Sequence, residues 1–231
     1  MIIINNLVAG YGSKKVLNQI DWSLDQGMIH GLVGLNGSGK TTLLKTMYGL
    51  LTPMSGTMKL DDKPFNKKFI SLLETEPYFY HGINGKEYLS LFKSYGDFQF
   101  NSDEWASLFQ LPLMELIDNY STGMRKKLAL LGIIKSNKPF LLLDEPFNGL
   151  DLEASRVLTA VLKRMKNDGK TILITSHMLE TLTNLCDRIH YLKNGIIQKT
   201  YFPEDLSLIN KEIFHELDQH IENKIDGLLE S

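Results

Sequence analysis

The feature that most constrains this chain is a glycine-rich loop, GLNGSGKTT, at residues 34–42. The loop follows the apolar run Ile29–Val33 and precedes a helical pattern over residues 40–50, so it joins a predicted strand to a predicted helix. A loop of the form GxxxxGK[ST] in that context is typical of phosphate-binding sites, because its glycines let the backbone curl and turn amide groups toward phosphate oxygens. The free N–H groups and positive dipole end of the following helix favour the same anion.

The loop residues have separate predicted roles in binding a nucleoside triphosphate. Lys40 is expected to hold the β- and γ-phosphates, and Thr41 to place its hydroxyl on Mg²⁺. A glycine-rich turn without a ligand is the alternative, and the strand and helix on either side of the loop argue against it. The predicted nucleotide-binding residues of the loop are Gly34, Asn36, Gly37, Ser38, Gly39, Lys40, Thr41 and Thr42.

Two carboxylates follow a second apolar run. Residues 140–143 read FLLL, the pattern of a strand buried on both faces, and Asp144 and Glu145 come directly after it. Ligands of α/β sheets bind at the carboxyl ends of the strands, so both side chains are expected beside the glycine-rich loop. Asp144 is placed to hold Mg²⁺ through water, and Glu145 to orient or deprotonate an attacking water. No Asn-Lys-x-Asp motif is visible, which disfavours small GTP-hydrolysing proteins.

A histidine follows a third predicted strand, Thr171–Thr175. A single histidine is usually a surface or core residue. His177, however, follows a strand that is expected to reach the same edge of the sheet. We therefore predict a contact between His177 and the γ-phosphate. With Lys40 and Glu145 it makes up the predicted catalytic set.

Length and composition limit the remaining possibilities. The 231 residues allow one domain, with or without a small subdomain. The net charge of -2 gives no basic excess, so nucleic acid is not an expected partner. Cys186 is the single cysteine, which excludes an internal disulfide framework and fits a reducing, cytoplasmic compartment. No apolar run approaches the ~18 residues of a membrane span, and residues 1–6 do not resemble a signal peptide.

Predicted strands alternate with helices along most of the chain, which indicates an α/β fold with a mostly parallel sheet. Three further motifs complete a resemblance, over nearly the whole chain, to the ATP-binding cassette (ABC) ATPases. YSTGM at residues 120–124 resembles the family signature, NGLD at residues 148–151 resembles its D-loop, and Tyr11 resembles the aromatic residue that stacks on adenine. The resemblance implies a P-loop NTPase fold with an N-terminal antiparallel β region, in a single ABC ATPase domain over residues 1–231.

The resemblance also implies ATP and Mg²⁺ as cofactors and a second cassette as partner. In the family, the signature residues face the γ-phosphate bound by another cassette, and here these are Ser121, Thr122 and Gly123. A head-to-tail dimer is therefore expected, a homodimer if the two chains are identical. Asp151 stands at the aspartate position of the D-loop. Ser121 also has a plain role as a helix N-cap, and the two roles are compatible.

Within the family, the motifs are most similar to ATPase subunits of bacterial exporters, in the branch of bacitracin and lantibiotic transporters. In such systems the ATPase is a separate polypeptide bound to an integral membrane permease, which implies a cytoplasmic protein peripheral on the inner face of the cell membrane. Two alternatives stay open. One is a soluble ABC ATPase of translation or DNA maintenance, disfavoured because no second cassette or long heptad segment is present. The other is a regulatory module in which Glu145 and His177 are idle.

Two positions depart from the family pattern. Thr75 stands where the family usually has the Q-loop glutamine, and Glu74 and Glu76 flank it. Carboxylate oxygen is a good ligand for Mg²⁺, so either glutamate is a candidate metal ligand, and solvated loop charges are the alternative. In the signature, Thr122 replaces a smaller residue and Met124 replaces the final glutamine. Thr122 therefore adds bulk near the nucleotide of the partner.

Residues 76–135 are predicted to form a helical subdomain inserted into the sheet domain, because they lack a convincing strand. The segment is rich in aromatic residues, which either build the core of the subdomain or form a surface for another protein. These residues are Tyr78, Phe79, Tyr80, Tyr88, Phe92, Tyr95, Phe98, Phe100, Trp105 and Phe109.

The C-terminal part of the chain has the pattern of an amphipathic helix, with apolar residues at three- and four-residue spacing. We expect this helix to pack on its own domain, and a contact with a partner is the alternative. The apolar positions are Ile209, Ile213, Leu217, Ile221, Ile225 and Leu228.

Overall fold

The computed structural model describes residues 1–61, 63–64, 66–177, 179–205, 209 and 225. Its centre is a six-stranded sheet with the order β10-β9-β3-β8-β7-β6. Neighbouring strands from β9 to β6 run parallel, and β10 pairs antiparallel with β9. The predicted α/β fold with a mostly parallel sheet is confirmed. The strands are β3 (Ile29–Val33), β6 (Ile70–Leu73), β7 (Phe140–Asp144), β8 (Thr171–Thr175), β9 (Arg188–Lys193) and β10 (Ile196–Tyr201).

A second, antiparallel sheet has the order β2-β1-β4-β5 and confirms the expected N-terminal β region. Its strands are β1 (Ile2–Tyr11), β2 (Lys14–Leu24), β4 (Ser55–Leu60) and β5 (Lys63–Pro64). In this sheet the sequence pattern predicts strands over residues 2–4 and 57–60, which are parts of β1 and β4, and none over residues 14–24. Register shifts interrupt the β1–β2 pairing, and Asn6 and Gln19 have left-handed φ angles of 49° and 51°. These bulges break the alternation of apolar and polar residues by which a strand is recognised.

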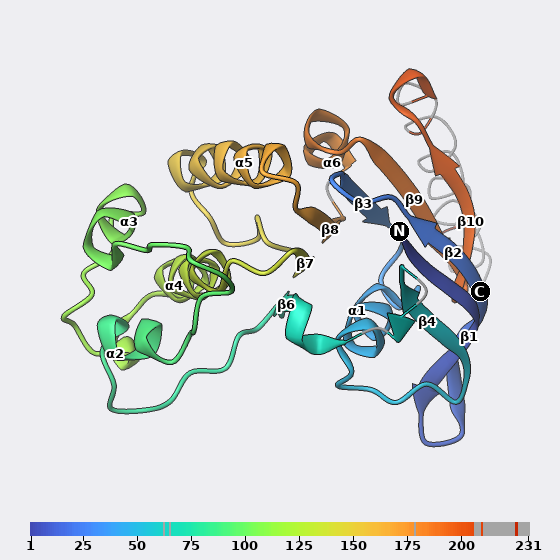
Figure 1. Ribbon diagram of the computed structural model, residues 1–231, viewed down its shortest axis with the longest axis horizontal. Coiled ribbons are helices and arrows are strands. Elements are labelled where there is room, and N and C mark those ends of the chain that lie inside the picture. The colour runs from blue at the N-terminus through green and yellow to red at the C-terminus, as the bar shows by residue number, and fades with distance from the viewer. Residues whose placement is uncertain (62, 65, 178, 206–208, 210–224, 226–231) are drawn as a thin grey trace.

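Helix α1 (Lys40–Tyr48) lies between the two sheets (Figure 1). Its side chains Leu43, Leu44 and Met47 are buried in one apolar cluster with residues from both sheets. The helix ends at Gly49, whose φ of 84° is in the left-handed region that favours glycine at a helix end. It is therefore two residues shorter than the pattern over residues 40–50 predicts.

The opposite face of the parallel sheet is covered by α4 (Thr122–Ser136), α5 (Leu152–Asn167) and α6 (Leu179–Leu185). Helices α2 (Gly85–Ser90) and α3 (Ser102–Leu108) lie beside α4, on the side of the molecule away from the antiparallel sheet (Figure 1).

Residues 76–135 contribute helices, loops and one isolated bridge between Asn84 and Leu116. The sequence pattern extends the first of these helices over residues 85–95, but α2 ends at Ser90. Beyond it the chain turns back toward α4, where the Tyr95 backbone N–H donates to the Ser136 carbonyl at 2.9 Å.

The aromatic residues of this segment divide between core and surface. Tyr88 and Phe109 are buried in an apolar cluster that continues under the parallel sheet. Tyr78 and Tyr80 remain 72% and 56% exposed. The core interpretation is confirmed for Tyr88 and Phe109, and a surface for another protein stays a prediction for the exposed residues.

Of the predicted C-terminal helix, Ile209 and Ile225 lie within the described residues. Ile209 is fully buried in the cluster under the parallel sheet, whereas Ile225 is 48% exposed. The other four apolar positions, Ile213, Leu217, Ile221 and Leu228, lie outside the described residues. None of the helices formed by described residues has the length and apolar character that a membrane crossing needs.

A buried pair of histidines connects the two sheets. The indole N–H of Trp22 donates to His190 Nδ1 at 3.1 Å, His190 Nε2 lies 3.1 Å from His30 Nδ1, and His30 Nε2 lies 2.9 Å from the Asp25 carbonyl oxygen. Because indole only donates, His190 carries its proton on Nε2 and donates to His30, which in turn donates to Asp25. Both rings are thus neutral. Burial lowers both pKa values, that of His190 to about 3 with a further contribution from His30.

This pair predicts a loss of stability in mild acid. The unfolded chain protonates His190 near its ordinary pKa of 6.5 while the folded chain keeps it neutral, so stability present above that pH falls as the pH drops toward 3. Between about pH 7.5 and 5.5, His190 should remove about 1.4 kcal/mol from the free energy of unfolding. Urea unfolding at both pH values measures the loss. In His190→Gln, whose amide takes up no proton, an undiminished loss would contradict the assignment.

Candidate nucleotide-binding site

The carboxyl ends of β3, β7 and β8 open into a cavity of about 900 Å³. Ten residues of the sequence prediction line this space, so segments far apart in the chain meet there. The predicted residues on its wall are Tyr11, Asn36, Gly37, Gly39, Lys40, Thr41, Thr42, Asp144, Glu145 and His177. Gly34 and Ser38 belong to the loop but not to the wall of the cavity.

The glycine-rich loop is shaped for close approach by an anion. Gly39 is the N-cap of α1 with a φ of 110°, a conformation that residues with a side chain rarely adopt, and no side chain caps the first turn. The N–H groups at the start of α1 are therefore available to an anion. The buried hydroxyl of Ser38 has no hydrogen-bond partner among the described residues. These donors fit the phosphate groups of a nucleotide.

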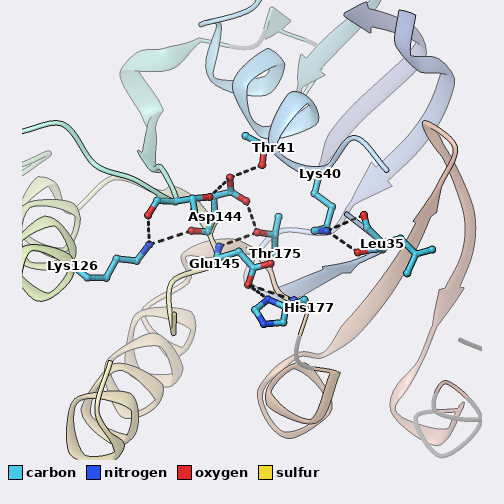
Figure 2. Close-up of polar contacts among 10 residues, drawn as sticks. Leu35, Lys40, Thr41, Lys126, Asp144, Glu145, Thr175 and His177 are labelled. Carbon is cyan, nitrogen blue, oxygen red and sulfur yellow. Dashed lines mark hydrogen bonds and ion pairs between the residues drawn. The ribbon is translucent and has the colours of Figure 1, made fainter. Parts of the chain in front are cut away.

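Lys40 extends from α1 back across the loop. Its ammonium donates to the carbonyl oxygens of Gly34 at 2.7 Å and Leu35 at 3.3 Å (Figure 2). Burial lowers the pKa of Lys40, and the nearby carboxylates of Glu145 and Asp144 oppose that shift. The side chain thus carries a poorly hydrated positive charge beside the loop, which a phosphate group would stabilise.

Asp144 is the most enclosed carboxylate of the cavity, at 2% exposed. Its Oδ2 accepts hydrogen bonds from the hydroxyls of Thr41 and Thr75, both at 2.8 Å, and its Oδ1 accepts from Thr175 at 2.6 Å (Figure 2). A carboxylate with hydroxyl groups around it supplies the hard oxygen atoms that Mg²⁺ prefers. The pair Thr41 and Asp144 therefore fits a magnesium site.

Glu145 follows Asp144 with a left-handed φ of 49°, which turns its side chain away from that of Asp144 and toward His177. Its Oε2 lies 3.0 Å from Nδ1 of His177 and accepts a longer hydrogen bond from the His177 backbone N–H. The Glu145 N–H donates to Thr175 Oγ1 at 3.0 Å. Backbone and side-chain contacts together orient the carboxylate into the cavity.

Thr75, and neither adjacent glutamate, lines the cavity. Glu74 points away and forms an ion pair with Lys45 on α1 at 3.2 Å, and Glu76 is exposed. The chain bends at residues 75 and 76, just past the end of β6, and of the three side chains that of Thr75 reaches the site. The residue that occupies the Q-loop position contributes a hydroxyl that donates to Asp144.

One wall of the cavity comes from β1, from β2 and from the turn between β9 and β10, and of its residues the sequence assigns Tyr11 alone to the site. Tyr11, 53% exposed, lies on this side of the cavity. The Asn18 N–H donates to the Gly195 carbonyl at 2.9 Å, and the Gly195 N–H donates to the Ser38 carbonyl at 3.1 Å. The turn between β9 and β10 thus supports the glycine-rich loop from outside. The unpredicted residues of this wall are Lys14, Lys15, Val16, Asn18, Asn194 and Gly195.

Thr175 is also absent from the predicted site, and Asn148, predicted as part of the D-loop motif, lines the cavity as well. Thr175 is the last residue of β8 and contacts both predicted carboxylate residues. A polar residue at the end of an apolar strand is the signal that marks Asp144, and the same signal identifies Thr175.

The signature residues lie away from the cavity of their own chain. Ser121 is exposed and is the N-cap of α4, where its Oγ accepts from the Met124 N–H at 3.2 Å, so the predicted capping role is confirmed. A side chain at Gly123 would come within 2.8 Å of the Gly149 carbonyl, so α4 packs closely on the D-loop segment. Asp151 caps α5, and its carboxylate pairs with Lys127 at 2.7 Å.

Comparison with known proteins identifies the family of this chain. The sequence profile described as "ABC transporter" matches residues 17–148. An uncharacterised ABC transporter ATP-binding protein of Methanocaldococcus jannaschii is 32% identical over 93% of this chain and 87% of its own. The lantibiotic transport ATP-binding protein SrtF of Streptococcus pyogenes is 28% identical over 94% and 99%. Nod factor export ATP-binding protein I of Burkholderia orbicola is 32% identical over 84% and 68%.

The fold agrees with the sequence relationship. A solved structure described as the ATP binding subunit of an ABC transporter has a TM-score of 0.79 and 25% identity to this chain, covering 92% of it and 93% of the solved chain. The chain belongs to the ABC transporter family, and it is an ATPase cassette of that family.

Proposed function

We propose that this chain is the ATP-hydrolysing subunit of an exporter, in which it drives a separate membrane subunit. One observation carries the proposal: a phosphate-binding loop, the Asp144 carboxylate and the Glu145–His177 pair face one cavity, while the signature residues face outward elsewhere. Export rather than import is supported by the relative named for Nod factor export and by the resemblance of the motifs to exporter ATPases.

The residues of the cavity have distinct roles in this proposal. Tyr11 stacks on adenine, and the glycine-rich loop with Lys40 holds the phosphates. Thr41 and Asp144 hold Mg²⁺, which supplies charge neutralisation at the phosphates when bound. Glu145 orients or deprotonates the attacking water, and His177 contacts the γ-phosphate. Catalysis is then mainly positioning and electrostatic stabilisation.

A second copy of the cassette completes the site. Ser121, Thr122 and Gly123 do not reach the cavity of their own chain, so the signature can contact a nucleotide only in trans. We expect a head-to-tail dimer in which each signature helix faces the γ-phosphate held by the partner, with Asp151 near the contact. Binding of ATP closes this dimer, and loss of the γ-phosphate opens it.

The helical subdomain over residues 76–135 is the proposed link to an integral membrane permease. It carries exposed apolar side chains, including Tyr78 at 72% and Met114 at 76%. The ring of Tyr78 packs against that of Tyr80, itself 56% exposed, and contiguous exposed apolar groups are typical of interaction surfaces. This arrangement would hold the ATPase on the cytoplasmic face of the cell membrane as a peripheral subunit.

Co-purification from detergent-solubilised membranes of the native host tests the transporter assignment. The tagged chain is expected to recover one polytopic membrane protein in stoichiometric amount. Tyr78→Glu and Met114→Glu should reduce that recovery, because a charge on an exposed apolar surface opposes docking, while ATP hydrolysis by the isolated cassette stays unchanged. Recovery only of ribosomes, DNA-repair proteins or no partner would move the assignment to a soluble ABC ATPase.

A further inference from the structure

Lys126 lies buried beneath the catalytic edge of the sheet. It is 4% exposed and extends from α4 toward the ends of β6 and β7. Its ammonium donates to the carbonyl oxygens of Thr75 at 3.2 Å, and of Glu74 and Asp144 at 3.4 Å each (Figure 2). One side chain thus joins three elements, namely the signature helix, the segment at the Q-loop position and the strand that carries Asp144.

Among the described residues, no carboxylate forms an ion pair with Lys126. Burial of an ammonium without an ion-pair partner is costly. Burial lowers the pKa of Lys126 to about 8, and the carboxylates of Asp144 and Glu145 oppose that shift. Removal of the Lys126 ammonium would also leave the carbonyl oxygens of Glu74, Thr75 and Asp144 without this donor. An ammonium that is buried despite its cost of desolvation indicates a role beyond packing.

We propose that Lys126 is a positioning residue for ATP hydrolysis: its ammonium holds the Glu74–Thr75 backbone against the end of β7, so that the Thr75 hydroxyl stays on the Asp144 carboxylate. Thr75 Oγ1 and Asp144 Oδ2 are 2.8 Å apart, and Lys126 bonds the backbone of both residues. Lys126 does not line the nucleotide cavity, so it acts through Thr75 and Asp144.

The position of Lys126 on α4 gives this contact a second consequence. Ser121, the signature serine, caps the same helix, so a displacement of α4 by the partner's nucleotide would be passed through Lys126 to Asp144. This step rests on the proposed dimer, whereas the positioning of Thr75 and Asp144 requires only ATP hydrolysis.

The test is the steady-state kinetics of Lys126→Met in the full chain. The kcat for ATP hydrolysis should fall at least about tenfold while KM for ATP changes less than about threefold, because no contact with nucleotide is removed. Lys126→Gln, which keeps two N–H donors but no charge, should also have a lowered kcat. This variant serves as the test if Lys126→Met does not fold. Lys126→Arg, which keeps both charge and donors, should recover most of the loss.

Lys170→Met is the matched control. Lys170 also donates to two backbone carbonyls, those of Asn137 at 2.7 Å and Lys138 at 3.1 Å, but it does so at the opposite end of β7. Burial lowers its pKa as well. The control variant should therefore suffer a comparable loss of buried hydrogen bonds and retain the parent kcat.

A double-mutant cycle with Thr75→Val separates positioning from a general loss of stability. If Lys126 acts through Thr75, the two substitutions remove the same contribution to kcat. The kcat of the double variant should then lie within about threefold of that of the slower single variant. Multiplying losses, or a parent-like kcat in both Lys126→Met and Lys126→Gln, would overturn the inference. Glu145→Gln measured alongside tests ATP hydrolysis itself: a parent chain without turnover is a failure of the proposed function, not of this inference.

Discussion

Glu145→Gln is expected to lower kcat for ATP hydrolysis at least about a hundredfold while ATP affinity stays within about threefold. The amide has nearly the size of the carboxylate but cannot take a proton from water. The side chain is held by two contacts from His177, so the substitution changes the chemistry at this position more than the geometry. ATP binding depends on the glycine-rich loop, which Glu145 does not contact by any hydrogen bond in the described residues.

Single-turnover hydrolysis and equilibrium binding of ATP measure the two quantities separately. Because hydrolysis is expected to open the dimer, Glu145→Gln with ATP should also elute as a dimer where the parent is mainly monomeric. Glu153→Gln is the control, since this carboxylate lies on the exposed start of α5 and accepts a hydrogen bond from the Gln110 side chain at 3.0 Å. Unchanged turnover in Glu145→Gln would refute the role assigned to this residue.

Asp144→Asn should abolish most hydrolysis, by at least about a hundredfold, and should weaken ATP binding only when Mg²⁺ is present. The carboxylate accepts from three threonine hydroxyls, and an amide would turn one acceptor into a donor facing them. It would also remove the negative charge that favours a divalent cation. The affinity for ATP in EDTA is set by the glycine-rich loop and should change less than about threefold.

Paired titrations with ATP, in Mg²⁺ and in EDTA, make this prediction specific. Asp103→Asn serves as the control, because Asp103 is exposed and pairs with Lys86 on the far side of the molecule. A loss of affinity that is equal in both buffers would mean that Asp144 supports the loop rather than the metal. A variant with parent-like hydrolysis would remove Asp144 from the mechanism.

The sequence predicts the meeting of distant segments well where parallel strands are involved. The glycine-rich loop, Asp144, Glu145 and His177 each follow an apolar run, and carboxyl ends of parallel strands share one edge of the sheet. The apolar runs predict the buried strands, and the polar residues after them mark the strand ends. The residues of the cavity floor can therefore be assigned to one site from the sequence.

Other features depend on side-chain direction, which composition does not carry. The segment of residues 74–76 offers three polar side chains, and the bend of the backbone past β6 directs Thr75 to the cavity and Glu74 to Lys45. The strands of the antiparallel sheet are underpredicted for a related reason, because bulges at Asn6 and Gln19 shift the alternation within β1 and β2.

Lys126 had a signal in the sequence, although a weak one. It precedes Leu130 by four residues and Ile133 by seven, the spacing that places side chains on one face of a helix. A lysine on an apolar stripe indicates a buried partner, but the sequence does not say that the partners are backbone carbonyls near residues 74–75 and 144. Only the meeting of three elements in space identifies them.

The support of the glycine-rich loop by the β9–β10 turn has a consequence for how the chain acquires its site during synthesis. Gly195 bonds both Ser38 and Asn18, so the glycine-rich loop receives its last wall from a segment far along the chain. Contacts of such high sequence separation form late in folding. A growing chain would therefore present the loop long before it could hold a ligand, and tight nucleotide capture would wait until the β9–β10 turn has been synthesised.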